Sequence, residues 1–191
     1  MTGGWSPTGA TRLAAVIGHP IRHSLSPMLC NAAFRAAGLD WVFVAFDVLE
    51  GRAPAALDAA RALGLGGLSV TMPHKQAVAG AVDRLTDEAR ALDAANCVVP
   101  EGDTLVGHNT DGAGFLRSLA ADAGIEPAGR RCAVLGAGGA ARAIVAALGR
   151  AGAAEVVVVN RTATRGEHAA TLAGEVGRTG VLTTSPVPTS S

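Results

Sequence analysis

Aromatic residues are scarce in this chain of 191 residues, making up 3% of it, and tyrosine is absent. This scarcity argues against a nucleic-acid surface that stacks bases on aromatic side chains. Sixteen basic and sixteen acidic residues cancel, so no general electrostatic attraction to nucleic acid or to an anionic membrane is expected. The sequence contains no run of eighteen apolar residues, and we expect no segment that spans a bilayer.

Cysteine is also rare, with Cys30, Cys97 and Cys132 far apart and set among apolar residues. Their odd number and wide spacing predict reduced core thiols of a cytoplasmic protein, and neither a disulfide framework nor a metal site. Residues 1–10 lack both a basic region and an apolar stretch, which predicts a disordered tail and not a signal peptide. The whole composition, 49% apolar and 17% charged, is typical of a globular chain.

Lysine occurs once, as Lys75, in a chain that otherwise uses arginine for positive charge. An arginine keeps its proton at any useful pH, whereas a desolvated lysine can exchange its proton. Lys75 follows the apolar segment 68–74, so it is a candidate proton-transfer group. A solvent-facing lysine retained by chance is the alternative.

Strands that alternate with helices predict an α/β fold with a mainly parallel sheet. In the first half we expect a helix capped by Ser26 and ended by Gly38, and in the second a helix that begins at 109–111. The other expected strands are 12–17, 41–48, 64–71, 97–100, 104–107, 132–135, 155–159 and a weak run at 180–184, and the other expected helices are 54–63, 76–92, 140–149 and 165–172.

A glycine-rich loop follows the strand 132–135 and opens the next helix. Its residues are Gly136, Ala137, Gly138, Gly139, Ala140 and Ala141. Glycines permit a tight turn and the close approach of a pyrophosphate, and the helix N-terminus supplies free N–H groups. In this strand–loop–helix setting the motif predicts dinucleotide binding.

The next strand ends in a second group of candidate cofactor residues, Asn160, Arg161, Thr162 and Arg165. NAD-specific units carry an acidic residue at this place, whereas an arginine accommodates a 2′-phosphate. The spacing of four would put Arg161 and Arg165 on one face of a helix, if the helix starts there. The pattern favours NADP over NAD, with two solvated surface arginines as the alternative.

Polar residues also gather at expected strand and loop ends in the first half. Ser24 and Ser26 would point the same way in an extended segment, although an N-cap with a Ser/Thr turn explains them as well. Ser69 and Thr71 repeat this spacing before Lys75. Asn96 and Asp111 are further such residues, and Asp111 has a simple helix N-cap as its alternative role.

Taken together, these motifs make the chain resemble the shikimate dehydrogenase family from about residue 13 to 165. The matching segments are 16–27 (VIGHPIRHSLSP), 69–75 (SVTMPHK), 95–97 (ANC), 107–112 (GHNTDG), 136–142 (GAGGAAR) and 160–162 (NRT). The resemblance implies an N-terminal mixed or parallel α/β substrate domain over 11–110, followed by an incomplete Rossmann-type NADP-binding domain over 111–191.

The resemblance also implies the roles of the residues. Lys75 and Asp111 would form the catalytic pair in the NADP-dependent interconversion of shikimate and 3-dehydroshikimate, in aromatic amino-acid biosynthesis. Ser24 and Ser26 would hold the substrate carboxylate, and Thr71, Asn96 and Asp111 its ring hydroxyls. Ser69 stands where many relatives have asparagine. Asp87 matches a residue near the cofactor, with a surface helix aspartate as its alternative.

The end of the chain departs from the family pattern, because residues 131–191 have room for two secure strands and a weak third, where a doubly wound domain has six. We therefore expect a C-terminally truncated member. It could be a gene fragment, an inactive module that still binds shikimate, or a chain completed by another one. A quinate-using or NAD-linked enzyme is the alternative activity, and a homodimer stays open.

Overall fold

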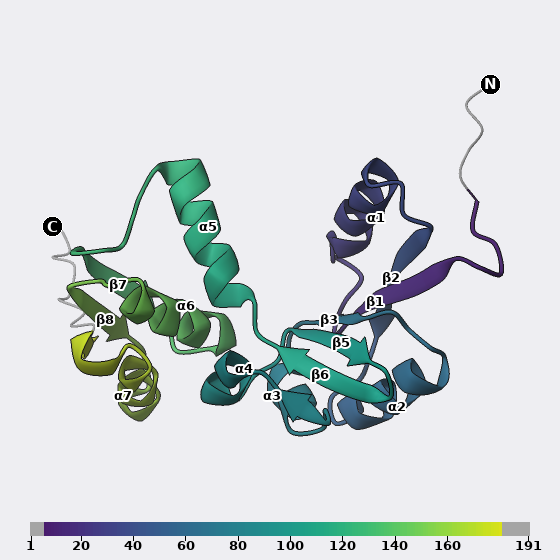
Figure 1. Ribbon diagram of the computed structural model, residues 1–191. Coiled ribbons are helices and arrows are strands. Elements are labelled where there is room, and N and C mark those ends of the chain that lie inside the picture. Colours follow the sequence, from purple (N-terminus) through teal and green to yellow (C-terminus); the bar gives the residue numbers. More distant parts are fainter. Residues whose placement is uncertain (1–5, 181–191) are drawn as a thin grey trace, which may run out of the picture. The chain divides into compact units, whose positions relative to one another are not determined.

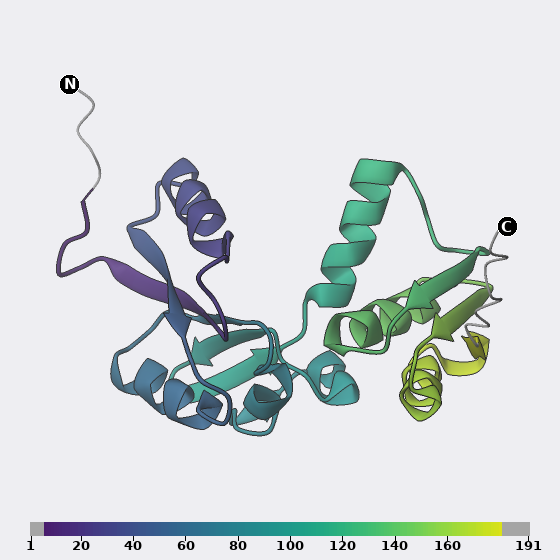
Figure 2. The ribbon, with the colours of Figure 1, turned by 180° about the vertical axis from the view of Figure 1, so that it is seen from behind.

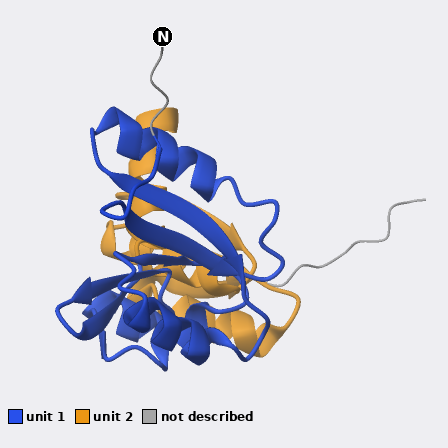
Figure 3. Ribbon diagram, turned by 90° about the vertical axis from the view of Figure 1, so that its right-hand side faces the viewer, with its two compact units in different colours: residues 1–109 blue, residues 110–191 orange. Residues whose placement is uncertain are grey.

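The computed structural model describes residues 6–180 and divides the chain into two compact units, residues 1–109 and 110–191 (Figure 3). Of the tail expected at 1–10, residues 1–5 lie outside the described part. The remainder includes a turn in which the Thr8 N–H donates to Thr11 Oγ1 at 2.8 Å. Among the described residues, no helix combines the length and apolarity needed to cross a membrane.

The first unit is built on a six-stranded sheet with the order β2-β1-β3-β5-β6-β4 (Figure 1). Its strands are β1 (Arg12–Gly18), β2 (Trp41–Asp47), β3 (Leu68–Val70), β4 (Arg84–Leu85), β5 (Cys97–Glu101) and β6 (Thr104–His108). The parallel pairs are β2–β1, β1–β3 and β4–β6, whereas β5 runs antiparallel to both β3 and β6. The sheet is therefore mixed. The tight turn at Gly102, which has φ +60°, returns the chain directly from β5 into β6 and so makes this pair antiparallel.

Helices cover the two faces of this sheet, with α1 (Ser26–Ala36) on one face and α2 (Ala53–Ala62) and α3 (Lys75–Ala79) on the other (Figures 1 and 2). Alternate residues of β1 explain the arrangement. Ala15 and Ile17 join the larger core with Leu57 of α2, whereas Ala14 and Val16 pack in the smaller cluster that contains Phe34 of α1. The strand alternation thus supplies both cores.

The prediction of a single helix over 76–92 is wrong. The chain instead forms α3, then the short strand β4, then α4 (Asp87–Leu92). Tertiary bonds interrupt the helix: the carboxylate of Asp83 accepts from the Leu105 N–H at 2.6 Å, and β4 pairs with β6. Thr86 then restarts the helix by accepting from the Ala89 N–H at 3.3 Å.

The second unit contains a parallel three-stranded sheet with the order β7-β8-β9 (Figure 1). The strands are β7 (Arg131–Leu135), β8 (Glu155–Val159) and β9 (Gly177–Gly180), and the helices are α5 (Asp111–Ala123), α6 (Gly139–Arg150) and α7 (Ala163–Thr171). The third strand begins earlier than the weak run expected at 180–184, whose residues 181–184 lie outside the described part. The core of the second unit contains Val134, Val156 and Val158 of its strands and Val145 and Leu148 of α6.

Two local expectations need correction. Ser26 does not cap α1: it is the first helical residue, and Leu25 holds the N-cap position. The three cysteines are free thiols, but each is only partly buried, whereas core thiols were expected. Burial still raises the pKa of the Cys97 thiol, which keeps it protonated near neutral pH.

Candidate functional site

Three of the candidate residues meet at the carboxyl edge of β3. Thr71 follows β3 directly, and its N–H donates to the carbonyl of Ile17 in β1 at 2.9 Å. The Val70 N–H donates to the Asn96 carbonyl at 2.8 Å, and the Ala95 N–H donates to the Lys75 carbonyl at 2.9 Å. These backbone bonds bring Thr71, Lys75 and Asn96 to one edge, where all three are partly exposed.

The loop after β1 lies against the same edge. A Cβ built on Gly18 would lie 2.5 Å from Thr71 Cγ2 and 2.8 Å from Ile21 Cδ1, so any larger residue here must displace these side chains. The His19 N–H also donates to the Met72 carbonyl at 3.0 Å. This contact places the segment that leads to Ser24 beside the turn that leads to Lys75.

The two serines of this loop do not lie in an extended segment, so strand alternation does not aim them. Ser26 is helical, and its N–H donates to Ser24 Oγ at 3.3 Å, which makes the Ser/Thr turn that was the alternative. Both side chains are nevertheless partly exposed at the start of α1. The turn fixes Ser24, whose oxygen retains a second lone pair for a ligand.

Ser69 and Asp111 occupy different settings. Ser69 lies within β3, opposite Val16 of β1 and Cys97 of β5. Asp111 is the first residue of α5 in the second unit, and Thr110 holds the N-cap position there. Asp111 is therefore not the N-cap that its alternative role required.

Sequence reasoning missed two histidines close to this edge in the sequence, one buried and one partly exposed. His74 is 1% exposed, and its Nε2 lies 2.7 Å from the Val48 carbonyl oxygen. His19 Nδ1 lies 2.7 Å from the Asp47 carboxylate, at the end of β2. The only sequence signal for His74 is its place between Pro73 and Lys75, because burial of a histidine follows from tertiary packing.

The glycine loop in the second unit has the geometry expected of a dinucleotide site. Gly136 has φ +109°, and its N–H donates to the Val159 carbonyl at 2.8 Å, which ties the loop to the end of β8. Gly138 is the N-cap of α6 and makes no side-chain cap bond. A Cβ on Gly138 or Gly139 would meet nothing within 4 Å. The helix N-terminus is thus open to a phosphate group.

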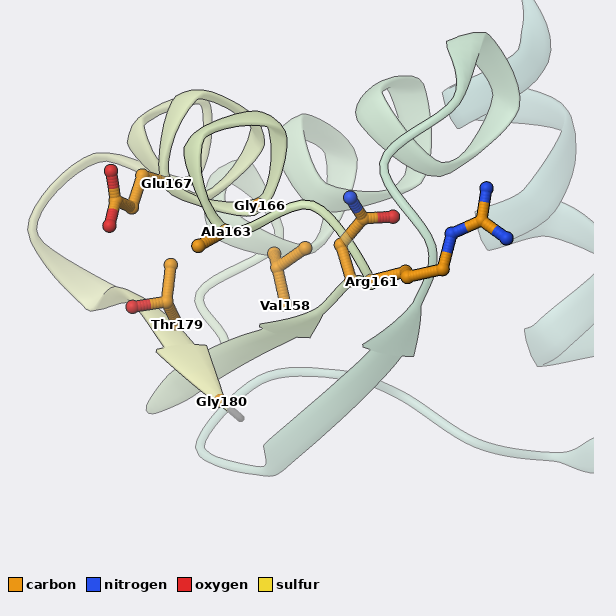
Figure 4. Close-up of a pocket in the computed structure, with 8 residues that line it drawn as sticks. Val158, Arg161, Ala163, Gly166, Glu167, Thr179 and Gly180 are labelled. Atoms are coloured by element: carbon orange, nitrogen blue, oxygen red, sulfur yellow. The ribbon is translucent and has the colours of Figure 1, made fainter. Parts of the chain in front are cut away.

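The residues after β8 line a cavity of about 150 Å³ (Figure 4). Asn160 and Arg161 border it, together with Ala163, Gly166 and Glu167 of α7 and Thr179 and Gly180 of β9. Figure 4 shows the guanidinium of Arg161 extending away from Glu167 and Thr179. The Asn160 side-chain amide donates to the Thr162 carbonyl at 2.8 Å and holds this turn.

Arg161 and Arg165 would share a helical face only if the helix started at Arg161, and this condition is not met, because α7 begins at Ala163. Both arginines are exposed and available to an anion. Asp87 lies in the first unit, in the first turn of α4. It is fully exposed and forms an ion pair with Arg90 at 3.3 Å.

Comparison with known proteins identifies relatives of both units. A family described as "Shikimate dehydrogenase substrate binding domain" matches residues 16–98, and "Shikimate / quinate 5-dehydrogenase" matches residues 118–185. The "Shikimate dehydrogenase (NADP(+))" of Geobacter metallireducens is 56% identical over 161 residues. That alignment covers 84% of this chain but 56% of the relative. The chain therefore spans about half the length of the curated relatives it matches.

Solved structures agree with the sequence matches. A shikimate dehydrogenase crystallised in complex with NADP⁺ has a TM-score of 0.87 at 34% identity, covering 93% of this chain and 64% of that one. A ligand-free 5-ketofructose reductase from a Gluconobacter strain has a TM-score of 0.82 at 36% identity, covering 91% of this chain and 63% of that one. Two proteins that match this chain with similar TM-scores and similar sequence identities are thus named after different substrates.

Proposed function

The chain belongs to the shikimate dehydrogenase family, and we propose that its first unit binds shikimate and its second unit NADP⁺ for oxidation of a ring hydroxyl. The observation that carries this proposal is the meeting of Thr71, Lys75 and Asn96 at one sheet edge. Backbone bonds of 2.8 and 2.9 Å hold them there. Polar side chains at the carboxyl ends of strands are where α/β sheets bind ligands.

The polar groups at this edge suit a polyhydroxylated acid. We assign the carboxylate of shikimate to the hydroxyls of Ser24 and Ser26, and its ring hydroxyls to Thr71, Asn96 and Asp111. Ser69 is assigned a supporting role at the same edge. A hydroxyl can donate to a carboxylate, and an amide or a carboxylate can accept from a ring hydroxyl.

Lys75 is proposed to relay the proton of the reacting hydroxyl, with Asp111 as its catalytic partner. When bound, NADP⁺ supplies the hydride acceptor for the carbon that carries this hydroxyl. The hydroxyl oxygen must lose its proton as the hydride leaves, and the amine form of Lys75 can take it. General acid–base assistance of this kind is worth about 10²–10⁴-fold in rate.

The second unit is proposed to hold the cofactor through two groups of residues. The loop formed by Gly136, Ala137, Gly138, Gly139 and Ala140 would receive the pyrophosphate. The open space over two of its glycines supports this assignment. The 2′-phosphate would lie against Asn160, Arg161, Thr162 and Arg165, and Asp87 stays a weaker candidate for a cofactor contact.

The test is a titration of the 191-residue protein with shikimate and NADP⁺, followed by thermal shift and by absorbance at the NADPH band. We expect Lys75→Ala and Lys75→Arg both to lose turnover while retaining shikimate binding, because arginine keeps the charge but cannot release a proton. Near-normal turnover in Lys75→Arg would exclude proton relay by Lys75. A stronger response to 5-ketofructose or quinate than to shikimate would redirect the substrate assignment.

A second candidate function is a module that binds shikimate without turnover. It is favoured by the share of the relatives that the chain covers, 56% of the Geobacter metallireducens protein. Shikimate-dependent thermal stabilisation without NADPH formation would select this alternative, and the absence of any shikimate effect would exclude both functions.

We further propose a cytoplasmic setting and no nucleic-acid or membrane partner. The balance of sixteen basic and sixteen acidic residues supports the second part of this proposal, the absence of a nucleic-acid or membrane partner. A homodimer stays a prediction that sedimentation analysis can check.

A further inference from the structure

The residue before the proposed proton-transfer group Lys75 is a buried histidine. His74 is 1% exposed, and its Nε2 lies 2.7 Å from the carbonyl oxygen of Val48. Because a carbonyl can only accept, the ring must carry its proton on Nε2 and donate it. His74 is the residue before Lys75, so this bond connects the start of α3 to the segment that follows β2.

The turn that leads into Lys75 is bonded on several sides. The His74 N–H donates to the Thr71 carbonyl at 3.0 Å, and the Val78 N–H donates to the His74 carbonyl at 2.8 Å. Val48, which receives the ring bond, is itself fixed, since its N–H donates to the Gly18 carbonyl at 3.1 Å. The ring is the single side chain in this set, and the other bonds are formed by the backbone.

We propose that His74 is a positioning residue for Lys75: its ring bond to Val48 closes the 71–75 turn and sets where the lysine amine lies. The inference rests on the proposed function only in giving that amine a catalytic role. A backbone turn alone leaves the first helical residue free to fray, whereas a buried side-chain bond one residue earlier restricts that motion.

The single lysine of the chain makes the proposal testable without turnover. Protein grown with ¹³Cε-labelled lysine gives one lysine side-chain signal, which belongs to Lys75. Acetylation of the folded protein, followed by mass spectrometry of the peptide that contains Lys75, gives the accessibility of the same amine. Shikimate affinity by calorimetry is the third measurement.

Three variants separate positioning from general stability. His74→Leu removes the donor, His74→Gln keeps an N–H at a similar reach, and Val78→Ala removes a fully buried side chain from the same short helix. We expect His74→Leu to raise the Lys75 acetylation rate by about tenfold, the equivalent of one lost buried hydrogen bond. Shikimate binding should be retained, as we expect for Lys75→Ala. His74→Gln should stay within about threefold of the parent protein, and Val78→Ala should leave the position of the lysine signal unchanged although it unfolds more easily.

The results that would overturn the proposal are specific. An unchanged lysine signal in folded His74→Leu would do so, as would a His74→Gln protein that is folded but behaves like His74→Leu. Equal effects of Val78→Ala and His74→Leu would assign His74 a stability role only. If the parent protein neither binds nor oxidises shikimate, the proposed function fails, while the acetylation and ¹³C comparison still decides whether His74 positions Lys75.

Discussion

Replacing Gly18 by alanine tests whether the end of β1 and the turn before Lys75 form one binding edge. The added Cβ would lie 2.5 Å from Thr71 Cγ2, 2.8 Å from Ile21 Cδ1 and 3.2 Å from the Met72 carbonyl oxygen. A carbon–carbon contact is favourable only at about 3.5–4.0 Å, so the Thr71 methyl must move by roughly 1 Å. The Met72 carbonyl is backbone and gives way less easily than a side chain.

The magnitude follows from this overlap. Overpacking of a well-packed site costs about 1–3 kcal/mol in stability. The displaced groups include Thr71 and the loop that carries Ser24, both assigned to shikimate. A movement of this size removes good hydrogen-bond geometry at one contact, which would weaken shikimate binding by about tenfold.

Gly66 is a matched control, because it lies near the opposite end of β1. A Cβ on Gly66 would lie 2.4 Å from two atoms of the Trp41 ring, an overlap of similar size, and the Gly66 N–H bonds to the Leu13 carbonyl near the start of β1. Gly66→Ala should therefore lower the urea midpoint by a comparable amount and leave shikimate affinity unchanged. Urea unfolding followed by circular dichroism and calorimetric titration of both variants are the assays. Equal losses of affinity in the two variants, or none in Gly18→Ala, would refute the reasoning.

Three further predictions concern pH and the cofactor. The Leu105 N–H, and then the Arg61 side chain, lower the pKa of Asp83. The stabilising contribution of its carboxylate is therefore present at neutral pH and is lost as the pH falls through that lowered pKa. The urea midpoint of Asp83→Asn should fall less steeply below about pH 4 than that of the parent. Burial raises the pKa of Cys97, so the thiol ionises first in the unfolded chain and stability declines above about pH 8.5. Cys97→Ala should flatten this alkaline decline, and an unchanged slope of the urea midpoint against pH would contradict the assignment. Arg161→Ala should raise the Kd for NADP⁺ by about tenfold with little effect on that for NAD⁺, because only NADP⁺ carries the 2′-phosphate that we assign to this guanidinium; equal effects on both would count against it.

Much of the architecture follows from local sequence patterns. The strand of five residues at 155–159 occurs where the apolar, β-branched run predicts it, and the glycine loop at 136–139 joins a strand to a helix as its composition requires. These elements need few distant partners to be recognised, because the glycines and the hydrophobic period already limit the backbone.

Other features depend on contacts between residues distant in the sequence. The break of the 76–92 helix arises when Asp83 bonds to Leu105 and β4 joins β6, and neither bond has a local signal.

The sequence by itself determined the kinds of chemistry available: one lysine, a glycine loop before a helix, and an arginine where an acidic residue would favour NAD. The tertiary structure alone decided that Thr71, Lys75 and Asn96 share an edge and that His74 is buried. The physical reason is that residue type is local information. Proximity instead comes from strand pairing, which joins residues more than twenty positions apart, as Val70 is joined to Asn96.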